Sequence, residues 1–410
     1  MNESKFVVVG GGMVAGYAAK QLVELGLTKG DLAILSGDTA LPYERPPLSK
    51  GFLAGKETEE SITINSEEFY REHRIDVRLG CEVLGVDPER KRLSLRSAEF
   101  GYHKLILATG ARVRKLDVPG AALTNVHYLR SLGDSKAIRR AAEGVKKAVV
   151  IGSGFIGMEV ASVLAQKGIE TTMVLREERI WKQFFSDEMS RFFEAYYVAR
   201  GVRFVKSATV SELRGNGAVS SVVLKDGQTI ACEMVVAGIG VRPVTDLFAT
   251  SGIEVSDGVM VNEYLEASRP DILAAGDIAN YQDVIFQKRR RVEHWDNAVS
   301  QGQYCARALM GERTPFRHVP YFFSDVFDLS YEFWGDPAGA DGVVHRGDLS
   351  SKSFSVWWLR QNAAVAAFTM NRPDEERDVA PKWIEAGQAV SSQRLKDASQ
   401  SIQTAVAGSS

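Results

Sequence analysis

The chain has 410 residues, which exceeds one ordinary hydrophobic core and favours two or three domains. With 45% hydrophobic and 25% charged residues and a formal net charge of -2, its composition is typical of a globular protein without the charge excess that attracts nucleic acid or a membrane surface. No run of about 18 uncharged apolar residues occurs, and the first residues lead directly into a strand pattern, so we expect a cytoplasmic protein with neither a membrane span nor a signal peptide.

The first clear element is the segment FVVVGGGMVAGYAAKQLVELG at 6–26. An apolar β-branched run predicts a buried parallel strand, a glycine cluster predicts a turn, and apolar residues then recur at helical spacing. Gly10 and Gly12 fall where a GxGxxG turn needs glycine, while Ala15 and Gly16 stand where its third glycine would fall. In such a turn the glycines let a pyrophosphate approach free N–H groups at the helix start. The segment therefore predicts a dinucleotide site.

The loop LPYERPPLSK at 41–50 follows this unit. Its prolines restrict φ and bias the preceding residues toward extended conformations, so we expect Arg45 and Lys50 on a stiff loop. Some flavoenzymes carry a redox cysteine pair at this place. The three cysteines of this chain are far apart in sequence: Cys81, Cys232 and Cys305. We therefore expect no thiol relay and, without HExxH or clustered His and Cys, no metal site.

A second Gly-rich unit, KAVVIGSGFIGMEVASVLAQKG at 147–168, repeats the pattern. It matches GxGxxG at Gly152, Gly154 and Gly157. One such match is weak evidence, because glycine after a strand is often only a turn, but two in the same strand–turn–helix context are much stronger. Two sites in one chain suggest a flavin dinucleotide and a nicotinamide dinucleotide, and hence hydride transfer between them.

Three further patterns lie toward the C-terminus. RPDILAAGDIAN at 269–280 predicts a short strand that ends in Gly276-Asp277, where α/β sheets bind ligands. SFSVWWLRQNAAVAAFTM at 353–370 predicts a hairpin of two alternating strands. The final segment ASQSIQTAVAGSS has the small polar composition of a disordered end.

Several motifs together resemble one enzyme family. They are VVVGGGMVAGYAA, KLILATGA (104–111), VVIGSGFIGMEVA, VVAGIGVRP (235–243), ILAAGDIA and RVEHWDNAVSQG (291–302). Together they resemble the FAD- and NAD(P)-dependent pyridine nucleotide oxidoreductase superfamily, and within it the ferredoxin reductase-like branch. That branch includes putidaredoxin reductase, the reductases of aromatic-ring dioxygenases, apoptosis-inducing factor and plant monodehydroascorbate reductase. The similarity extends to about residue 385.

The resemblance implies an α/β fold with two Rossmann-like, glutathione reductase-like dinucleotide domains and a C-terminal α/β domain. An FAD domain would be split between residues 1–113 and 243–319. An NAD(P)H domain would occupy 114–242, and the C-terminal domain with a flexible tail would occupy 320–410. Monomer and dimer both stay open.

The resemblance also assigns the FAD-binding residues, which are Gly10, Gly12, Gly16, Asp38, Arg45, Lys50, Val83, Arg112, Arg130, Asp277 and Trp295. Lys50 would stabilise the anionic reduced ring electrostatically. Asp38 would bind the adenosine ribose, although it stands 28 residues after Gly10 instead of the usual ~20. The alternative for Asp38 is a solvated loop residue.

On the nicotinamide side the matching residues are Gly152, Gly154, Ile156, Gly157, Glu159, Arg176, Glu177, Gly240, Glu293 and His294. Glu159 matches an acid that the family places near Lys50 and the nicotinamide; its alternative role is stabilising the helix macrodipole. Glu177 matches the ribose-binding Glu of plant monodehydroascorbate reductases and favours NADH, whereas Arg176 could pair with the 2′-phosphate of NADPH. His294 is a candidate proton donor, or else a core histidine.

The electron acceptor is indicated by residues of the C-terminal part of the chain and of the segment 291–302. Phe323 stands where family members have Trp or Tyr, so we expect Lys50, Glu159, Trp295 and Phe323 to form the catalytic group. The ascorbate-binding arginines of monodehydroascorbate reductases map to Val299 and Asp325, and neither residue binds an anion. Asp325 instead matches the FWSD-type motif of reductases that serve redox proteins.

These residues favour an NAD(P)H-dependent FAD oxidoreductase that passes single electrons to an acidic ferredoxin-type protein. The basic run KRRR at 288–291 could dock such a partner, or be a solvated loop or a contact to cofactor phosphate. One alternative is a reductase of monodehydroascorbate or a quinone. Another is a flavoprotein that responds to NADH, like apoptosis-inducing factor.

Overall fold

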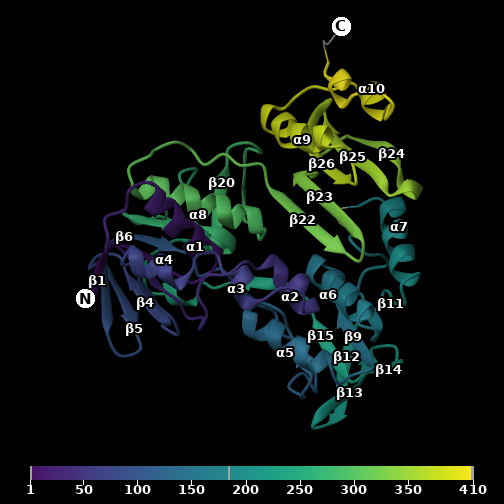
Figure 1. The fold of residues 1–410 in the computed structure, drawn as a ribbon, viewed down its shortest axis with the longest axis horizontal. Helices are drawn as coiled ribbons and strands as arrows, with labels where there is room; N and C mark the ends of the chain where they lie inside the picture. Colours follow the sequence, from purple (N-terminus) through teal and green to yellow (C-terminus); the bar gives the residue numbers. More distant parts are fainter. Residues whose placement is uncertain (1, 183–184, 408–410) are drawn as a thin grey trace. The chain divides into compact units, whose positions relative to one another are not determined.

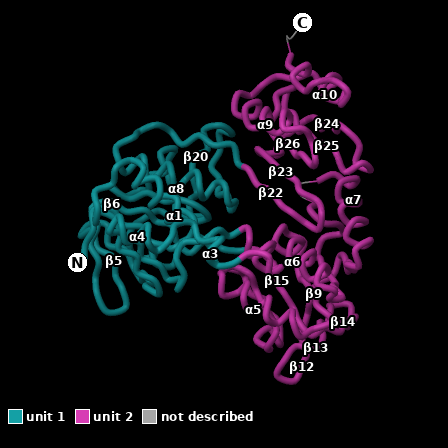
Figure 2. Tube along the Cα trace, viewed as in Figure 1, with its two compact units in different colours: residues 1–45, 58–112, 241–320 teal, residues 46–57, 113–240, 321–410 magenta. Residues whose placement is uncertain are grey.

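The computed structural model describes residues 2–182 and 185–407, and the chain forms two compact units (Figure 2). Unit 1 contains residues 1–45, 58–112 and 241–320, and unit 2 contains residues 46–57, 113–240 and 321–410. Each unit is therefore assembled from three separate stretches of the chain. The loop predicted to be stiff, 41–50, divides between the units after Arg45.

The main sheet of unit 1, the unit that holds the N-terminus in Figure 1, has the first predicted strand in its interior. In spatial order its strands are β3 (Asp76–Arg78), β2 (Leu32–Leu35), β1 (Glu3–Val9), β6 (Glu99–Leu107), β5 (Arg92–Leu95) and β4 (Val83–Asp87), and β19 (Ile272–Ala274) also pairs with β6. β1 is parallel to β2 and β6, and β19 is parallel to β6. Their Val, Ile and Leu runs are buried because helices cover the sheet.

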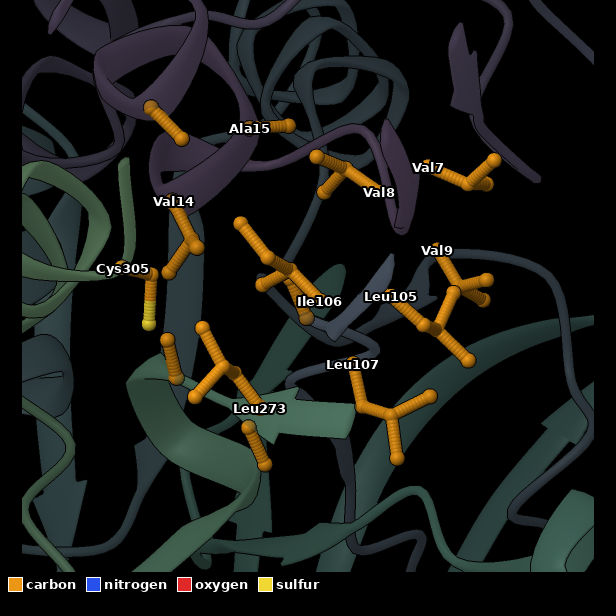
Figure 3. Packing of buried hydrophobic residues seen from close by; sticks show 14 of the residues in the cluster. Val7, Val8, Val9, Val14, Ala15, Leu105, Ile106, Leu107, Leu273 and Cys305 are labelled. Atoms are coloured by element: carbon orange, nitrogen blue, oxygen red, sulfur yellow. The ribbon is translucent and has the colours of Figure 1, made fainter. Parts of the chain in front are cut away.

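The core of unit 1 joins this sheet to two helices, α1 (Met13–Glu24) and α8 (Trp295–Leu309). In Figure 3, Val14 of α1 and Cys305 of α8 lie on the same side of the sheet as Ile106 of β6 and Leu273 of β19. Leu105 and Leu107 face the other way, as the alternation of a strand requires. Strand β19 therefore ends inside this packed layer, where the Gly276-Asp277 turn was predicted.

The remaining elements of unit 1 are short. A second sheet has the order β17 (Val255–Ser256), β18 (Gly258–Met260), β20 (Ala279–Asp283) and β21 (Lys288–Arg290). The other helical segments are α3 (Glu59–Ile62), α4 (Glu67–Glu72), η2 (Asp246–Phe248) and η3 (Gly276–Ile278). A two-stranded ribbon pairs β16 (Val241–Pro243) with β7 (Ala111–Val113), whose last residue belongs to unit 2.

Unit 2 begins with the remainder of the 41–50 loop and then builds the second Gly-rich sheet. Its strands are β11 (Val202–Val205), β10 (Glu170–Val174), β9 (Lys147–Ile151), β15 (Met234–Ala237) and β8 (Val126–His127), all parallel. Its helical segments are η1 (Pro46–Ser49), α2 (Gly51–Ala54), α5 (Leu132–Ala142), α6 (Phe155–Gln166) and α7 (Asp187–Val198). An antiparallel sheet contains β12 (Val210–Asn216), β13 (Ala218–Leu224) and β14 (Thr229–Ala231).

The C-terminal part of unit 2 is an antiparallel sheet. Its order is β22 (Tyr321–Val326), β23 (Leu329–Gly335), β26 (Ala363–Met370), β25 (Ser353–Arg360) and β24 (Gly342–Asp348). The predicted hairpin is confirmed as β25 and β26, whose turn holds Gln361 and Asn362 at positive φ. The remaining helical segments are η4 (Leu349–Ser351), α9 (Asp374–Ala386), α10 (Ser392–Lys396) and η5 (Ile402–Ala405).

The prediction of a disordered C-terminal end is wrong for the described residues, although 408–410 lie outside them. Ile402 and Ala405 of η5 are buried, and Val406 bridges to Val390. The Arg346 side chain, which is 2% exposed, donates to the carbonyl oxygens of Leu395 at 3.1 Å and Gln400 at 2.6 Å. A buried guanidinium therefore holds the tail, which its small polar composition did not reveal.

Among the residues described, we find no helix that is both long and apolar enough to cross a membrane.

Candidate functional site

The first Gly-rich turn has the geometry of an anion cradle. Gly10 has φ +122°, and a Cβ there would lie 2.1 Å from the carbonyl oxygen of Ala108. Gly12 is the N-cap of α1, and it places no capping side chain on the first N–H groups of that helix. A Cβ on Gly12 would lie 3.7 Å from a guanidinium nitrogen of Arg45. Uncapped N–H groups with a cation beside them fit a pyrophosphate.

The second turn repeats this geometry in unit 2. Gly152 has φ +111°, and a Cβ there would lie 2.2 Å from the carbonyl oxygen of Gly238. Gly154 is the uncapped N-cap of α6 and faces open space. A Cβ on Gly157 would lie 2.6 Å from the carbonyl oxygen of Gly152, so glycine is needed for the helix to approach the turn.

The residues after β10 lie beside the second turn. Ser153 donates through its Oγ to the Glu177 carboxylate at 3.1 Å, which fixes this acid against the Gly-rich loop. Arg176 and Ile156 are exposed, and so is Gly240, whose carbonyl accepts from the Arg114 N–H at 2.9 Å. Of the two charged candidates that follow β10, the acid is therefore the one held at the turn.

Glu159 of α6 is the centre of a buried polar cluster in unit 2. Its side chain is 4% exposed, and its carboxylate accepts from Lys50 Nζ at 2.9 Å and Ser324 Oγ at 2.6 Å. The hydroxyl of Ser49 donates to the same carboxylate. Lys50 Nζ also lies 5.2 Å from the centre of the Phe323 ring. The macrodipole alternative is therefore insufficient for Glu159, because the carboxylate faces inward and binds three donors.

In unit 1, Glu44 of the 41–50 loop is a carboxylate that binds side-chain donors, as Glu159 does in unit 2. It accepts from the Tyr17 hydroxyl and from Trp295 Nε1, both at 2.5 Å. Trp295 is thereby fixed at the first residue of α8. Burial, and then the contact with Glu44, raises the pKa of Tyr17, so this phenol stays a hydrogen-bond donor.

Two other candidates of unit 1, Asp38 and Arg112, bind partners within that unit. The Asp38 carboxylate accepts hydrogen bonds from the N–H groups of Thr39 and Ala40 and from the Tyr43 hydroxyl. These partners therefore all lie within the five residues that follow it. Arg112 pairs with Asp246.

Three further candidates sit at or beside helix and strand starts. Val83 begins β4, and Asp277 lies in η3, directly after Gly276. The main-chain carbonyl of Asp277 accepts from Arg291 at 3.0 Å. Arg130, in unit 2, donates its backbone N–H to Asp134 at 3.0 Å.

His294 is the N-cap of α8, and the adjacent Glu293 is exposed. Desolvation lowers the pKa of His294 to about 4, although the carboxylates of Asp277 and Asp296 oppose that effect. The ring is therefore neutral at pH 7, which argues against His294 as an imidazolium proton donor.

The three arginines of the basic run 288–291 make contacts within unit 1. Arg289 donates to the carbonyl oxygens of Val261 and Asn280. Arg290 pairs with the buried Asp283 at 3.3 Å. Arg291, whose side chain is 11% exposed, pairs with Asp257 and Glu293. These arginines therefore have structural contacts within unit 1, and a role of the run in docking an acidic partner stays a prediction.

These cradles fit two dinucleotides, and the comparison with known families agrees. A family model described as pyridine nucleotide-disulphide oxidoreductase matches residues 4–302. The chain belongs to this family. A second model, described as reductase C-terminal, matches residues 321–406. As a member of the pyridine nucleotide-disulphide oxidoreductase family, the protein is an oxidoreductase that uses FAD and NAD(P)H, which confirms the predicted fold class and cofactors.

Individual relatives point to two branches of the pyridine nucleotide-disulphide oxidoreductase family. Monodehydroascorbate reductase 4 of Arabidopsis thaliana is 36% identical over 94% of this chain and 83% of its own length. A ferredoxin reductase from Rhodopseudomonas palustris superposes with TM-score 0.93 at 32% identity, over 99% of this chain and all of its own. Putidaredoxin reductase, solved as a covalent complex with putidaredoxin, superposes with TM-score 0.93 at 30% identity, over 98% and 97% of the chains.

Sequence reasoning missed Ser49, Ser324, Tyr17 and Glu44. One signal was present: Tyr17 and Glu159 each stand seven residues after the first glycine of their turn, Gly10 and Gly152. The hydroxyl donors to Glu159 carry no such signal, because Ser49 and Ser324 are 110 and 165 residues away from it in sequence.

Proposed function

We propose that this protein is an NADH-dependent ferredoxin-type reductase. It would accept a hydride from NADH and deliver electrons singly to an iron–sulfur protein, without a redox disulfide. FAD, when bound, supplies the conversion between two-electron and one-electron chemistry. The observation that carries the proposal is the likeness to two reductases of redox proteins over nearly the whole chain.

The chain's own residues would bind and orient the cofactors. Residues 1–113 and 243–319 would hold FAD, residues 114–242 would hold the nicotinamide dinucleotide, and residues 320–410 would form the acceptor side. Gly10, Gly12 and Arg45 would hold the flavin pyrophosphate, and Gly152, Gly154 and Gly157 the nicotinamide one. These assignments are supported by the uncapped helix starts and the close glycine contacts.

The preference for NADH is supported by Glu177. Its carboxylate, fixed by Ser153, can accept a hydrogen bond from a ribose 2′-hydroxyl and repels a 2′-phosphate. Arg176 is exposed and supplies the competing hypothesis. Replacing Glu177→Gln should lower kcat/KM for NADH roughly ten-fold and raise the NADPH:NADH ratio. Equal kcat/KM values for both nucleotides in the unmodified enzyme would refute the preference.

The acceptor assignment is supported by two positions. Asp325 is exposed on β22, and Val299 lies on α8. Neither side chain can bind an anionic small acceptor, since neither carries a positive charge.

The second candidate is a monodehydroascorbate reductase, which the 36% identity to the Arabidopsis enzyme favours. Steady-state turnover with a purified ferredoxin, with monodehydroascorbate and with a quinone separates the two. We expect the highest kcat/KM with ferredoxin.

The double variant Val299→Arg, Asp325→Arg sharpens this test. It should gain monodehydroascorbate turnover and lose ferredoxin turnover, while flavin reduction by NADH stays within about two-fold. Absence of ferredoxin turnover in the unmodified enzyme, together with rapid monodehydroascorbate reduction, would make the second candidate the correct one.

A further inference from the structure

Three segments far apart in sequence meet at one carboxylate in unit 2. Glu159 comes from α6, Ser49 and Lys50 from η1 and the residue after it, and Ser324 from β22. Ser49 and Ser324 are each 1% exposed, and Glu159 is 4% exposed. A carboxylate removed from water to this extent needs donors for its lone pairs, and here every donor is a side chain.

The donors divide between the two oxygens. Ser49 donates to Oε2, whereas Ser324 Oγ at 2.6 Å and Lys50 Nζ at 2.9 Å both lie on Oε1. Ser49 therefore holds one end of the carboxylate, and Ser324 sets the position of the oxygen that Lys50 binds. Because Ser324 is uncharged, it stabilises the carboxylate without competing electrostatically with the ammonium.

The strand that carries Ser324 is fixed to α6 at a second point. The Phe327 N–H, three residues after Ser324, donates to Ser162 Oγ at 2.8 Å. Ser162 stands three residues after Glu159 on α6, and Phe327 stands three residues after Ser324, in the turn that follows β22. The Phe327 contact fixes the backbone near Ser324, which keeps the Ser324 hydroxyl within hydrogen-bond distance of Glu159.

We propose that Ser324 is a positioning residue for Lys50, acting through Glu159. The inference rests on the proposed function as an FAD-dependent reductase, and on the flavin-stabilising role that the family resemblance implies for Lys50. Removing the hydroxyl would leave Oε1 with one donor, so Glu159 and the Lys50 ammonium would sample more than one arrangement. The expected consequence is a slower reaction with little change in nucleotide affinity, because positioning acts on the reacting geometry.

The chain offers a matched control in Ser355 of β25. It is also fully buried, lies in the same sheet and donates to a buried carboxylate, Glu376, at 2.7 Å. Ser355→Ala should destabilise the fold as Ser324→Ala does, but it leaves Lys50 untouched. Ser324→Thr keeps the hydroxyl and serves as the rescue.

The experiment uses the FAD-loaded enzyme and two readouts. The first is the acylation rate of Lys50, measured by mass spectrometry against the exposed Lys56 of the same chain. The second is the stopped-flow rate of flavin reduction at increasing NADH concentrations. Ser324→Ala should acylate Lys50 roughly ten-fold faster and lower the limiting reduction rate roughly ten-fold, with the apparent Kd for NADH changed less than two-fold.

Ser324→Thr should restore both readouts, and Ser355→Ala should change only the thermal midpoint. Unchanged Lys50 acylation and reduction rates in Ser324→Ala, with the same loss of thermal stability as Ser355→Ala, would overturn the proposal. Neither readout involves an electron acceptor. Failure to reduce a ferredoxin would therefore refute the proposed function while leaving the role of Ser324 supported by its own measurements.

Discussion

Helices α1 and α6 start from turns of nearly the same geometry in different units. Gly10 and Gly152 have φ +122° and +111°, and a Cβ on either would meet a carbonyl oxygen at 2.1 or 2.2 Å. Gly12 and Gly154 are uncapped N-caps. The scaffold that presents N–H groups to a pyrophosphate is thus shared by both helices.

The two helices differ at the seventh residue after that first glycine. α1 has Tyr17, a neutral donor to the Glu44 carboxylate, and α6 has Glu159, a carboxylate that binds Lys50 and two serines. Both residues contact the 41–50 loop, one at each end. The same position therefore anchors the loop in both units but leaves a charged, cation-binding group in unit 2 only.

The largest expected effect comes from breaking the shared scaffold. Gly10→Ala and Gly152→Ala should each lower the free energy of unfolding by at least about 3 kcal/mol, because a Cβ would overlap a carbonyl oxygen in a positive-φ conformation. Urea unfolding measures the loss. Gly154→Ala is the control, since a Cβ there meets nothing within 4 Å, and it should cost less than about 1 kcal/mol. Equal losses for Gly152→Ala and Gly154→Ala would contradict the steric argument.

The next largest effect is expected on the rate of flavin reduction, and it compares substitutions of Glu159 and Tyr17. Glu159→Gln should slow flavin reduction by NADH roughly 10–100-fold, because it removes the charge that orients Lys50. Tyr17→Phe removes one donor to Glu44, which keeps its bond from Trp295, and should change the rate less than about three-fold. Stopped-flow absorbance measures both. If the two variants slow flavin reduction equally, Glu159 of α6 has no role in the reaction beyond that of Tyr17 in α1.

Local patterns predicted the scaffold well. The GxGxxG spacing, the apolar runs and the Gly276-Asp277 turn are each contained in a few residues, and the structure has the strand, turn or helix that each predicts. The Glu159 cluster could be predicted only in part: resemblance placed Lys50 with Glu159, but nothing local links Ser324 to either. The prediction for the tail used composition, which does not reveal that the buried Arg346 binds the main-chain carbonyl of Gln400. Composition likewise does not reveal the contacts of the 288–291 run, such as the pair between Arg290 and the buried Asp283.

A smaller effect is expected at the third position of each turn. A Cβ on Gly157 would lie 2.6 Å from the carbonyl oxygen of Gly152. The equivalent residue of α1 is Ala15, which has a Cβ and is fully buried. Gly157→Ala should therefore cost about 2 kcal/mol and weaken NADH binding, since helix and turn must separate. Ala15→Gly should cost about 1 kcal/mol, mainly from backbone entropy and lost packing. Denaturant unfolding with and without NADH checks both. Stabilisation by Gly157→Ala would show that α6 does not need the close approach.

The smallest expected effect compares a histidine in each unit. Desolvation lowers the pKa of His294 in unit 1 to about 4, and it also lowers the pKa of His127 in unit 2. A histidine whose folded pKa lies below its unfolded value stays neutral in the fold while the unfolded chain takes up a proton, so stability falls as the pH falls below about 6.5. The pKa of Glu376 is lowered from a value already near 4.5, so that carboxylate titrates below the window from pH 6.5 to 5. Because His294 is only partly buried, we expect it to account for roughly 1 kcal/mol of the loss in that window.

Urea unfolding at pH 7 and pH 5 measures this loss. Between these pH values, His294→Asn should lose roughly 1 kcal/mol less stability than the unmodified protein, and the difference for His127→Asn should be smaller. An identical pH dependence in all three proteins would mean that neither ring is held neutral by the fold.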